Sequence, residues 1–141
     1  MSANKKIIII DGSVTDLTLL EGIIYSISPD AQCISFVYAD EAVKVILHDM
    51  KQPPQYILID ADTARMPVLK FLQCFRQLPE WDSCCIGIFS TTMPSAVVEA
   101  YKKEGADFAF QKPLNKREGM KLLVAILAMT RVIDKPIMQV V

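Results

Sequence analysis

The stretch YILID, residues 56–60, is an apolar run that ends on a carboxylate. Four other runs are apolar almost throughout, and they are KIIII (6–10), QCISFV (32–37), CCIGIF (84–89) and DFAF (107–110). None shows the regular in–out alternation of a strand with one face in water, so burial on both faces is expected. Strands of this kind are typical of a parallel sheet between two layers of helices, which predicts an α/β fold.

The segments between these runs carry apolar residues at helical spacing, for example at Leu17 and Ile24. Several residues mark the expected helix ends: Ser13 and Asp40 as N-caps, Pro94 before a fourth helix, Gly105 after it, and a last helix over about 115–130. The alternating order contains no linker or repeat, so residues 1–130 are predicted to form one domain. Residues 131–141, which Pro136 interrupts, are expected to form a C-terminal tail.

Composition narrows the class of protein. The 141 residues are 52% hydrophobic and 22% charged, which favours a packed core over disorder. No apolar run approaches the roughly 20 residues that cross a membrane, and the formal net charge of -1 gives no basic surface for nucleic acid. The 4 cysteines lack CxxC spacing, so neither a zinc site nor a disulfide framework is indicated. A cytoplasmic protein without a membrane or nucleic-acid partner is expected.

Residues able to do chemistry stand at the ends of several predicted strands. They are Asp11, Asp60, Ser90 and Lys112. In an open parallel sheet the carboxyl ends of the strands share one edge, and ligands bind there at the point where the strand order reverses. Each residue taken alone fits an ordinary helix cap or strand-end polar group, but the four together predict one shared pocket.

The predicted pocket has the chemistry of a phosphoryl site. The carboxylates of Asp11, Asp60 and Asp62 are hard oxygen ligands suited to Mg²⁺, which keeps its remaining positions for water and phosphate oxygens. Lys112 supplies a positive charge, and the hydroxyl of Ser90 can donate a hydrogen bond. An aspartate in such a setting can itself act as the nucleophile and become an aspartyl phosphate.

Four motifs carry a resemblance to a known family: KKIIIIDGS, YILIDAD, IGIFSTT and GADFAFQKP, of which the last is the most specific. Over about residues 5–130 the chain resembles the receiver domain of two-component response regulators, also called CheY-like. The resemblance implies a doubly wound five-stranded parallel sheet of order 2-1-3-4-5, a flavodoxin-like fold with helices on both faces. It also implies these residue roles: Asp60 as phosphoacceptor, Ser90 as the hydroxyl that contacts the phosphoryl group, Lys112 as charge partner, Asp11 as acidic pocket residue, and a cis bond to Pro113.

The resemblance further implies the partners and the kind of activity. In this family the phosphoryl donor is a phosphohistidine on a sensor histidine kinase or on a phosphotransfer protein. The signal then passes to a downstream protein target through protein–protein interaction. Mg²⁺ is the expected cofactor, and no enzymatic activity is expected beyond self-phosphorylation and self-dephosphorylation.

Three positions depart from the family pattern. Gly12 stands where a second acid is usual, so one carboxylate ligand of the metal is missing. A unit-charge pair at about 4 Å is worth about 4 kcal/mol at an effective dielectric of about 20, and weak Mg²⁺ binding is therefore expected. Thr91 is bulkier than the usual alanine and is expected to narrow access to the acceptor. Ala109 stands where an aromatic switch residue is usual, and its neighbours Phe108 and Phe110 face the other way.

Two alternatives remain open. The three departures favour a degenerate receiver that binds partner proteins without phosphorylation. Its last helix, rich in apolar residues over 122–129, either packs on the sheet or supplies a homodimer surface. The second alternative is a small flavodoxin-like enzyme or cofactor binder, and the segment DGSVTD (11–16) argues against it because it lacks the glycines of a GxGxxG motif or P-loop.

Overall fold

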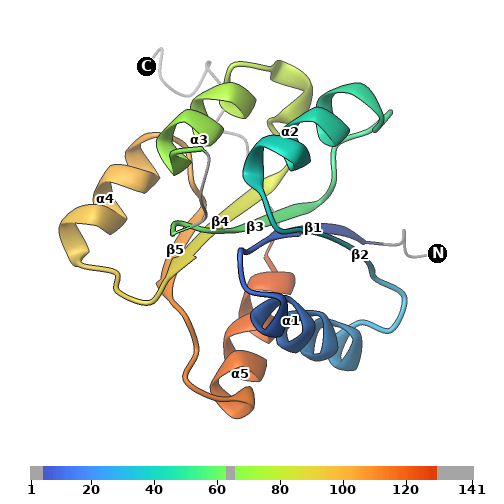
Figure 1. Ribbon diagram of the computed structural model, residues 1–141, viewed down its shortest axis with the longest axis vertical. Helices are drawn as coiled ribbons and strands as arrows, with labels where there is room; N and C mark the ends of the chain where they lie inside the picture. Colours follow the sequence, from blue (N-terminus) through green and yellow to red (C-terminus); the bar gives the residue numbers. More distant parts are fainter. Residues whose placement is uncertain (1–4, 63–65, 130–141) are drawn as a thin grey trace, which may run out of the picture.

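The computed structural model describes residues 5–62 and 66–129, so the predicted tail at 131–141 lies outside the described residues. At its centre is a five-stranded, all-parallel sheet of order β2-β1-β3-β4-β5 (Figure 1). This confirms the doubly wound sheet and the strand order expected from the sequence. The strands are β1 (Lys6–Ile10), β2 (Gln32–Phe36), β3 (Tyr56–Asp60), β4 (Cys85–Ser90) and β5 (Phe108–Gln111).

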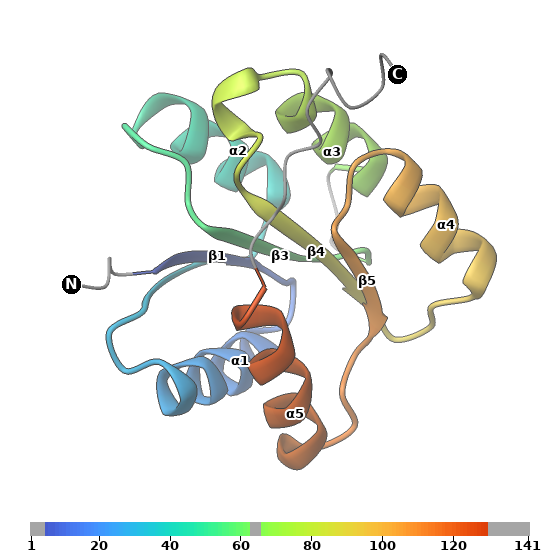
Figure 2. The same ribbon diagram turned by 180° about the vertical axis from the view of Figure 1, so that it is seen from behind.

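Helices cover both faces of the sheet. Helices α1 and α5 lie side by side on one face, and α2, α3 and α4 lie on the other, as Figure 1 and the reversed view in Figure 2 show. None of the helices in the described ranges combines the length and apolar composition that crossing a membrane requires. The helices are α1 (Val14–Ile27), α2 (Ala39–His48), α3 (Val68–Arg76), the short 3-10 helix η1 (Pro79–Trp81), α4 (Ser95–Lys103) and α5 (Lys116–Leu127).

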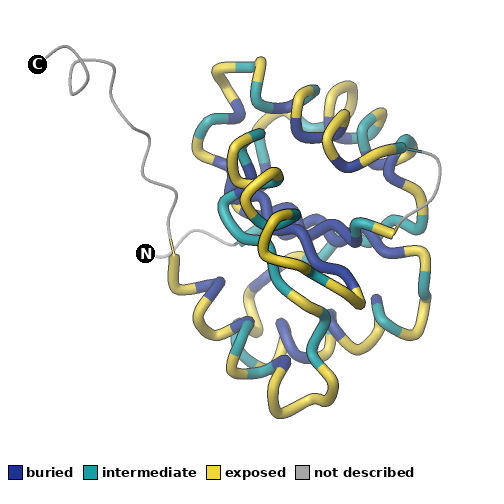
Figure 3. The backbone as a smooth tube through the Cα atoms, turned by 90° about the vertical axis from the view of Figure 1, so that its left-hand side faces the viewer, coloured by how far each residue is buried: buried dark blue, intermediate teal, exposed yellow. Residues whose placement is uncertain are grey.

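Alternate residues of one strand supply two separate cores. In β1, Ile7 and Ile9 pack against α1 and α5, whereas Ile8 and Ile10 pack against α2 and α3. All four isoleucines are fully buried, and Figure 3 shows this burial along the strands between two layers of helices whose outer turns are exposed. Each buried isoleucine contributes about 1.5–3 kcal/mol relative to an exposed one, which explains why the continuous apolar runs form the sheet.

The helix starts agree with most of the predicted caps. The side-chain oxygen of Ser13 accepts a hydrogen bond from the backbone N–H of Asp16 at 3.2 Å, and Asn115 caps α5 in the same way. The predicted N-cap at Asp40 is wrong, because α2 already begins at Ala39. Ala39 is fully buried, so packing against the sheet, and not the position of the best capping residue, sets this start.

The turn between α4 and β5 depends on Gly105. Its φ of 110° lies in a region that residues with a side chain rarely adopt, which confirms the predicted stop after the fourth helix. A Cβ at this position would also lie 2.6 Å from Cγ of Arg76, whose guanidinium donates to the Gly105 carbonyl oxygen at 2.9 Å. Backbone conformation and side-chain space therefore both require glycine.

Replacing Gly105 with alanine is expected to lower the free energy of unfolding by about 1–3 kcal/mol, because the backbone is strained and Arg76 must shift. Gly22→Ala is the matched control, since Gly22 lies within α1 and a Cβ there meets nothing within 4 Å. The control is expected to gain roughly 0.5–1 kcal/mol from helix propensity. Urea unfolding measures both effects, and equal stability of the two variants would contradict this account of the turn.

Candidate functional site

The polar strand-end residues converge at one edge of the sheet. Asp60 and Ser90 are the last residues of β3 and β4, while Asp11 and Lys112 directly follow β1 and β5. Neighbouring ends are joined through the backbone, because the N–H of Lys112 donates to the carbonyl oxygen of Ser90 at 2.8 Å. Within the described part of the chain, Asp11, Asp60 and Ser90 are the buried polar residues, at 0%, 5% and 5% exposure. Burying polar groups is costly, so their common position indicates a site.

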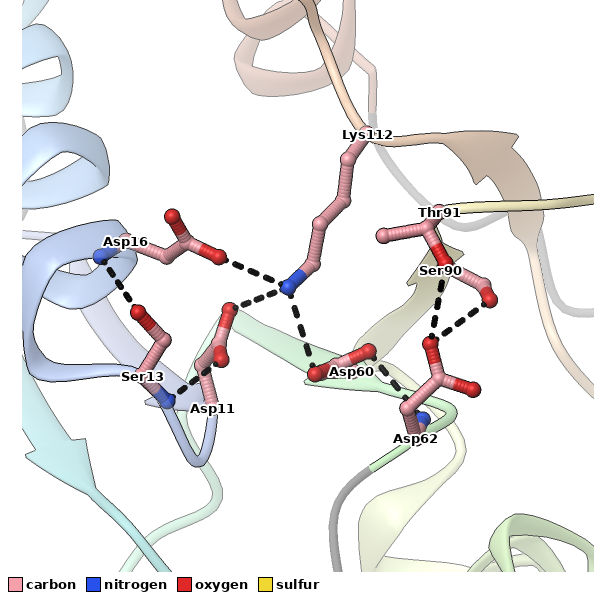
Figure 4. A network of polar contacts seen from close by, with 8 residues as sticks. All are labelled: Asp11, Ser13, Asp16, Asp60, Asp62, Ser90, Thr91 and Lys112. Atoms are coloured by element: carbon pink, nitrogen blue, oxygen red, sulfur yellow. Dashed lines mark hydrogen bonds and ion pairs between the residues drawn. The ribbon is translucent and has the colours of Figure 1, made fainter.

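The ammonium group of Lys112 lies among three carboxylates (Figure 4). Its Nζ is 2.8 Å from Oδ2 of Asp16, 3.0 Å from Oδ2 of Asp11 and 3.2 Å from Oδ2 of Asp60. The lysine side chain is only 17% exposed, so these contacts replace most of its hydration. The structure thus brings Asp60 and Lys112 into contact, and Lys112 is shared with two further acids.

Asp16 is a site residue that the sequence analysis missed. It lies in the first turn of α1, where its backbone N–H bonds to Ser13 and its carboxylate reaches Lys112. The N–H of Ser13 in turn donates to Oδ1 of Asp11 at 2.9 Å, so this short loop directs both acids toward the lysine. The N-cap predicted at Ser13 could have identified Asp16, because the third residue after an N-cap lies on the first helical turn, close to the preceding strand end.

Burial and charge act in opposite directions on the ionisable groups of the site. Burial raises the pKa of Asp11, against the Ser13 N–H and Lys112, which lower it. Burial also acts to lower the pKa of Lys112, but its hydrogen bonds to Asp16 and Asp11 outweigh this effect and the pKa is raised overall. Lys112 is therefore a permanent cation at neutral pH, and it compensates charges that the site would otherwise bury unpaired.

The carboxylate of Asp62 is directed toward the end of β4. Its Oδ2 accepts a hydrogen bond from Oγ of Ser90 at 3.0 Å and lies 3.5 Å from Oγ1 of Thr91. The backbone N–H of Asp62 donates to Oδ1 of Asp60 at 3.1 Å. Figure 4 shows Asp60 between Lys112 and Asp62, so the two carboxylates of the DAD sequence engage different partners.

The three predicted Mg²⁺ ligands do not surround a common point. Asp11 and Asp60 share Lys112, and Asp62 is turned to the hydroxyls. Over residues 5–62 and 66–129, no group of three or more acidic, histidine or cysteine side chains is placed to hold a metal ion. A Cβ at Gly12 would meet nothing within 4 Å, so packing does not require glycine at this position. In the arrangement described, the three carboxylates are not gathered into one site, so the predicted Mg²⁺ site stays a prediction.

Strand β5 lacks an aromatic residue on the α4 side, as expected. Phe108 and Phe110 pack on the α1–α5 side, where the ring centroid of Phe110 is 5.7 Å from that of Phe89. Ala109 pairs with Ile88, whose side chain belongs to the opposite core. The cis bond implied for Pro113 is wrong, because every peptide bond among the described residues is trans, the preferred isomer before proline.

Solved structures of response regulators share this fold. The phosphorylated cyanobacterial phytochrome response regulator RcpA matches with a TM-score of 0.79 over 92% of this chain and 100% of its own, at 14% sequence identity. The Mn²⁺-bound response regulator Rcp1 matches with a TM-score of 0.73 over 89% of this chain and 93% of its own, at 18% identity. The chain therefore has the fold of a CheY-like receiver domain of response regulators.

Curated relatives carry a name from the same class. Stress response regulator protein 1 of Candida dubliniensis (strain CD36) is 29% identical over 108 residues, which are 77% of this chain and 37% of the relative. The protein of the same name from Candida albicans (strain SC5314) is 28% identical over 108 residues. The match thus spans little more than a third of these relatives' length, 37% in both cases. No family model matches the chain.

Proposed function

We propose that this chain is a receiver that accepts a phosphoryl group on Asp60 and signals through protein–protein interaction. One observation carries the proposal: the carboxylate of Asp60 lies at the end of the central strand β3, is 7% exposed and contacts Lys112 at 3.2 Å. A carboxylate oxygen in this position can act as the nucleophile, and the lysine can balance the charge that a phosphoryl group adds. The receiver fold supports this function.

The proposed donor is a phosphohistidine on a sensor histidine kinase or on a phosphotransfer protein. An oxygen of Asp60 forms the new bond to phosphorus while the phosphorus–nitrogen bond breaks, and the imidazole leaves with the electron pair and takes a proton from water. Lys112 faces the acceptor, and Ser90 is the hydroxyl proposed to donate to the phosphoryl group. The chain is a phosphoacceptor with no enzymatic activity beyond self-phosphorylation and self-dephosphorylation, and it works in the cytoplasm with protein partners.

Incubation with acetyl phosphate and Mg²⁺ is expected to add one phosphoryl group to the intact protein, with acetate as the leaving group. Asp60→Ala is expected to abolish the mass gain, because it removes the nucleophile. Asp30→Ala, which removes an exposed acid in the turn before β2, is expected to retain it. Mass spectrometry of the intact chain reads the result, and an unmodified wild type, or a mass gain that survives in Asp60→Ala, would exclude this function.

Mg²⁺ is the proposed cofactor, in line with the Mn²⁺ bound to the similar response regulator Rcp1. Because Gly12 offers no carboxylate, the ion is expected to bind weakly, and the mass gain should rise with added Mg²⁺ well into the millimolar range. Omission of Mg²⁺ in the presence of EDTA provides the reference for this titration.

A degenerate receiver that acts as a protein-interaction module is the second candidate. It is favoured by Asp16, which makes the shortest contact to Lys112 and holds it from the side away from Asp60. In this case target binding is the same in the wild type and in Asp60→Ala. A homodimer would use the exposed side of α5 and the residues that follow it, where Val124 and Met129 are 49% and 50% exposed, and sedimentation at rising concentration tests for it.

A further inference from the structure

The hydrogen bond between Asp62 and Ser90 occupies a hydroxyl beside the proposed acceptor Asp60. Ser90 is 5% exposed, and its hydroxyl donates to Oδ2 of Asp62 at 3.0 Å. Thr91, the next residue, brings a second hydroxyl to the same oxygen at 3.5 Å. The hydroxyls at the end of β4 are therefore hydrogen-bonded to a carboxylate oxygen while Asp60 carries no phosphoryl group.

A serine hydroxyl has a single proton to donate. If it is donated to Asp62, it cannot at the same time be donated to a phosphoryl oxygen on Asp60. Hydrogen bonds to charged acceptors are stronger than those to neutral ones, so the carboxylate of Asp62 and a phosphoryl oxygen are comparable acceptors for this proton. Asp62 and a phosphoryl group on Asp60 thus compete for the same hydroxyl.

The negative charges of Asp62 and of a phosphoryl group on Asp60 increase the competition between them. The backbone N–H of Asp62 donates to Oδ1 of Asp60 at 3.1 Å, which keeps the second acid close to the acceptor. Lys112 lies on the other side of Asp60, in contact with Asp11 and Asp16 (Figure 4). A phosphoryl group would add negative charge between the lysine and Asp62, and like charges repel. The hydrogen bond between Ser90 and Asp62 must break before the Ser90 hydroxyl can donate to a phosphoryl group.

We propose that Asp62 is an internal competitor that holds the hydroxyl of Ser90 and so opposes anion binding at Asp60. This inference rests on the proposed function for the identity of the anion, and it assigns to Asp62 a role opposite to that of a metal ligand. A competitor weakens phosphoryl binding, whereas a ligand of the predicted Mg²⁺ would strengthen it. Asp62 is a positioning residue, because it acts through Ser90.

Beryllofluoride, a mimic of the phosphoryl group, is the probe, titrated at saturating Mg²⁺ and followed by NMR of the amides. Asp62→Ala is expected to bind it about tenfold more tightly than the wild type, the effect of removing one hydrogen bond to a charged group. Asp62→Asn keeps an acceptor oxygen without the charge, so an intermediate affinity is expected. Asp30→Ala, the control for lost charge, should bind as the wild type does.

Two results in this titration would overturn the proposal. Equal or weaker binding by Asp62→Ala would show that the carboxylate does not compete and would support the metal-ligand role. An equal gain from Asp62→Ala in a Ser90→Ala background would show that the effect does not pass through the serine hydroxyl, since coupled residues must be non-additive.

Failure of the proposed function is recognised separately. If neither the wild type nor any variant binds beryllofluoride or gains mass with acetyl phosphate, phosphorylation on Asp60 is excluded, and the contact itself is tested in the unmodified protein. Asp62→Ala is then expected to shift the amide signals of Ser90, Thr91 and the start of α4, and Asp30→Ala to leave them unchanged. Identical spectra over these residues in both variants would overturn the inference.

Discussion

Lys112→Met is expected to lower the free energy of unfolding by about 3–5 kcal/mol, the usual cost of removing one partner from a buried ion pair. The ammonium contacts Asp11 and Asp60, whose side chains are 1% and 7% exposed, and also the more exposed Asp16. Methionine has a similar length and fills the same space, so the loss measures charge and not packing. Urea unfolding at neutral pH provides the measurement.

Two controls separate the effect of this site from that of a lost surface charge. Lys121→Met removes an exposed lysine of α5 and is expected to change stability by less than about 0.5 kcal/mol. Asp11→Asn added to Lys112→Met is expected to recover part of the loss, because one buried charge no longer needs a partner. A loss below about 1 kcal/mol in Lys112→Met would contradict the buried network.

The loss in the free energy of unfolding caused by Lys112→Met should also depend on pH. An acid whose pKa is raised in the folded state costs stability above its unfolded pKa, and this cost disappears as the pH falls toward that value. Burial raises the pKa of Asp11 above the ordinary 3.8, and the loss of Lys112 removes an influence that lowers it. The variant is therefore expected to be less destabilised at about pH 5 than at about pH 7.

Arg76→Ala is expected to destabilise the chain by about 3–5 kcal/mol. The guanidinium donates to the carbonyl oxygens of Gly105, Trp81 and Cys84 at 2.9, 3.0 and 2.9 Å, and it pairs with Asp107 at 2.9 Å. It thus connects the end of α3 to the segments that lead into β4 and β5. Denaturant unfolding, with the exposed Arg117→Ala as control, measures the loss.

Arg76→Lys distinguishes this network from a simple charge pair. A lysine has one compact donor group and cannot reach acceptors in several directions as the planar guanidinium does, so it is expected to recover only part of the stability. Full recovery would show that the pairing with Asp107 alone matters. Arg76 bonds to Cys84 and Asp107, which precede β4 and β5, whereas Asp60 is the last residue of β3. The folded fraction of both variants should therefore still form the acetyl phosphate adduct.

The fold could be predicted from the sequence because burial on both faces affects every residue of a strand. The runs that contain Ile7–Ile10 and Tyr56–Asp60 are apolar without alternation, and both form central strands. Helix ends were less predictable. The N-cap at Ser13 depends on local hydrogen bonding and was correct, whereas the start of α2 depends on the burial of Ala39, which local propensity does not express.

That Asp11, Asp60, Ser90 and Lys112 lie at one edge of the sheet follows from the order of strands and helices along the chain, because parallel strands place all their carboxyl ends on the same side. How these groups pair follows from the folded chain alone. The loop after β1 brings Asp16 to Lys112, and the turn after β3 directs Asp62 to Ser90. Such pairing depends on side-chain rotamers and loop paths that bring residues within hydrogen-bond distance across different elements, and spacing along the chain does not specify them.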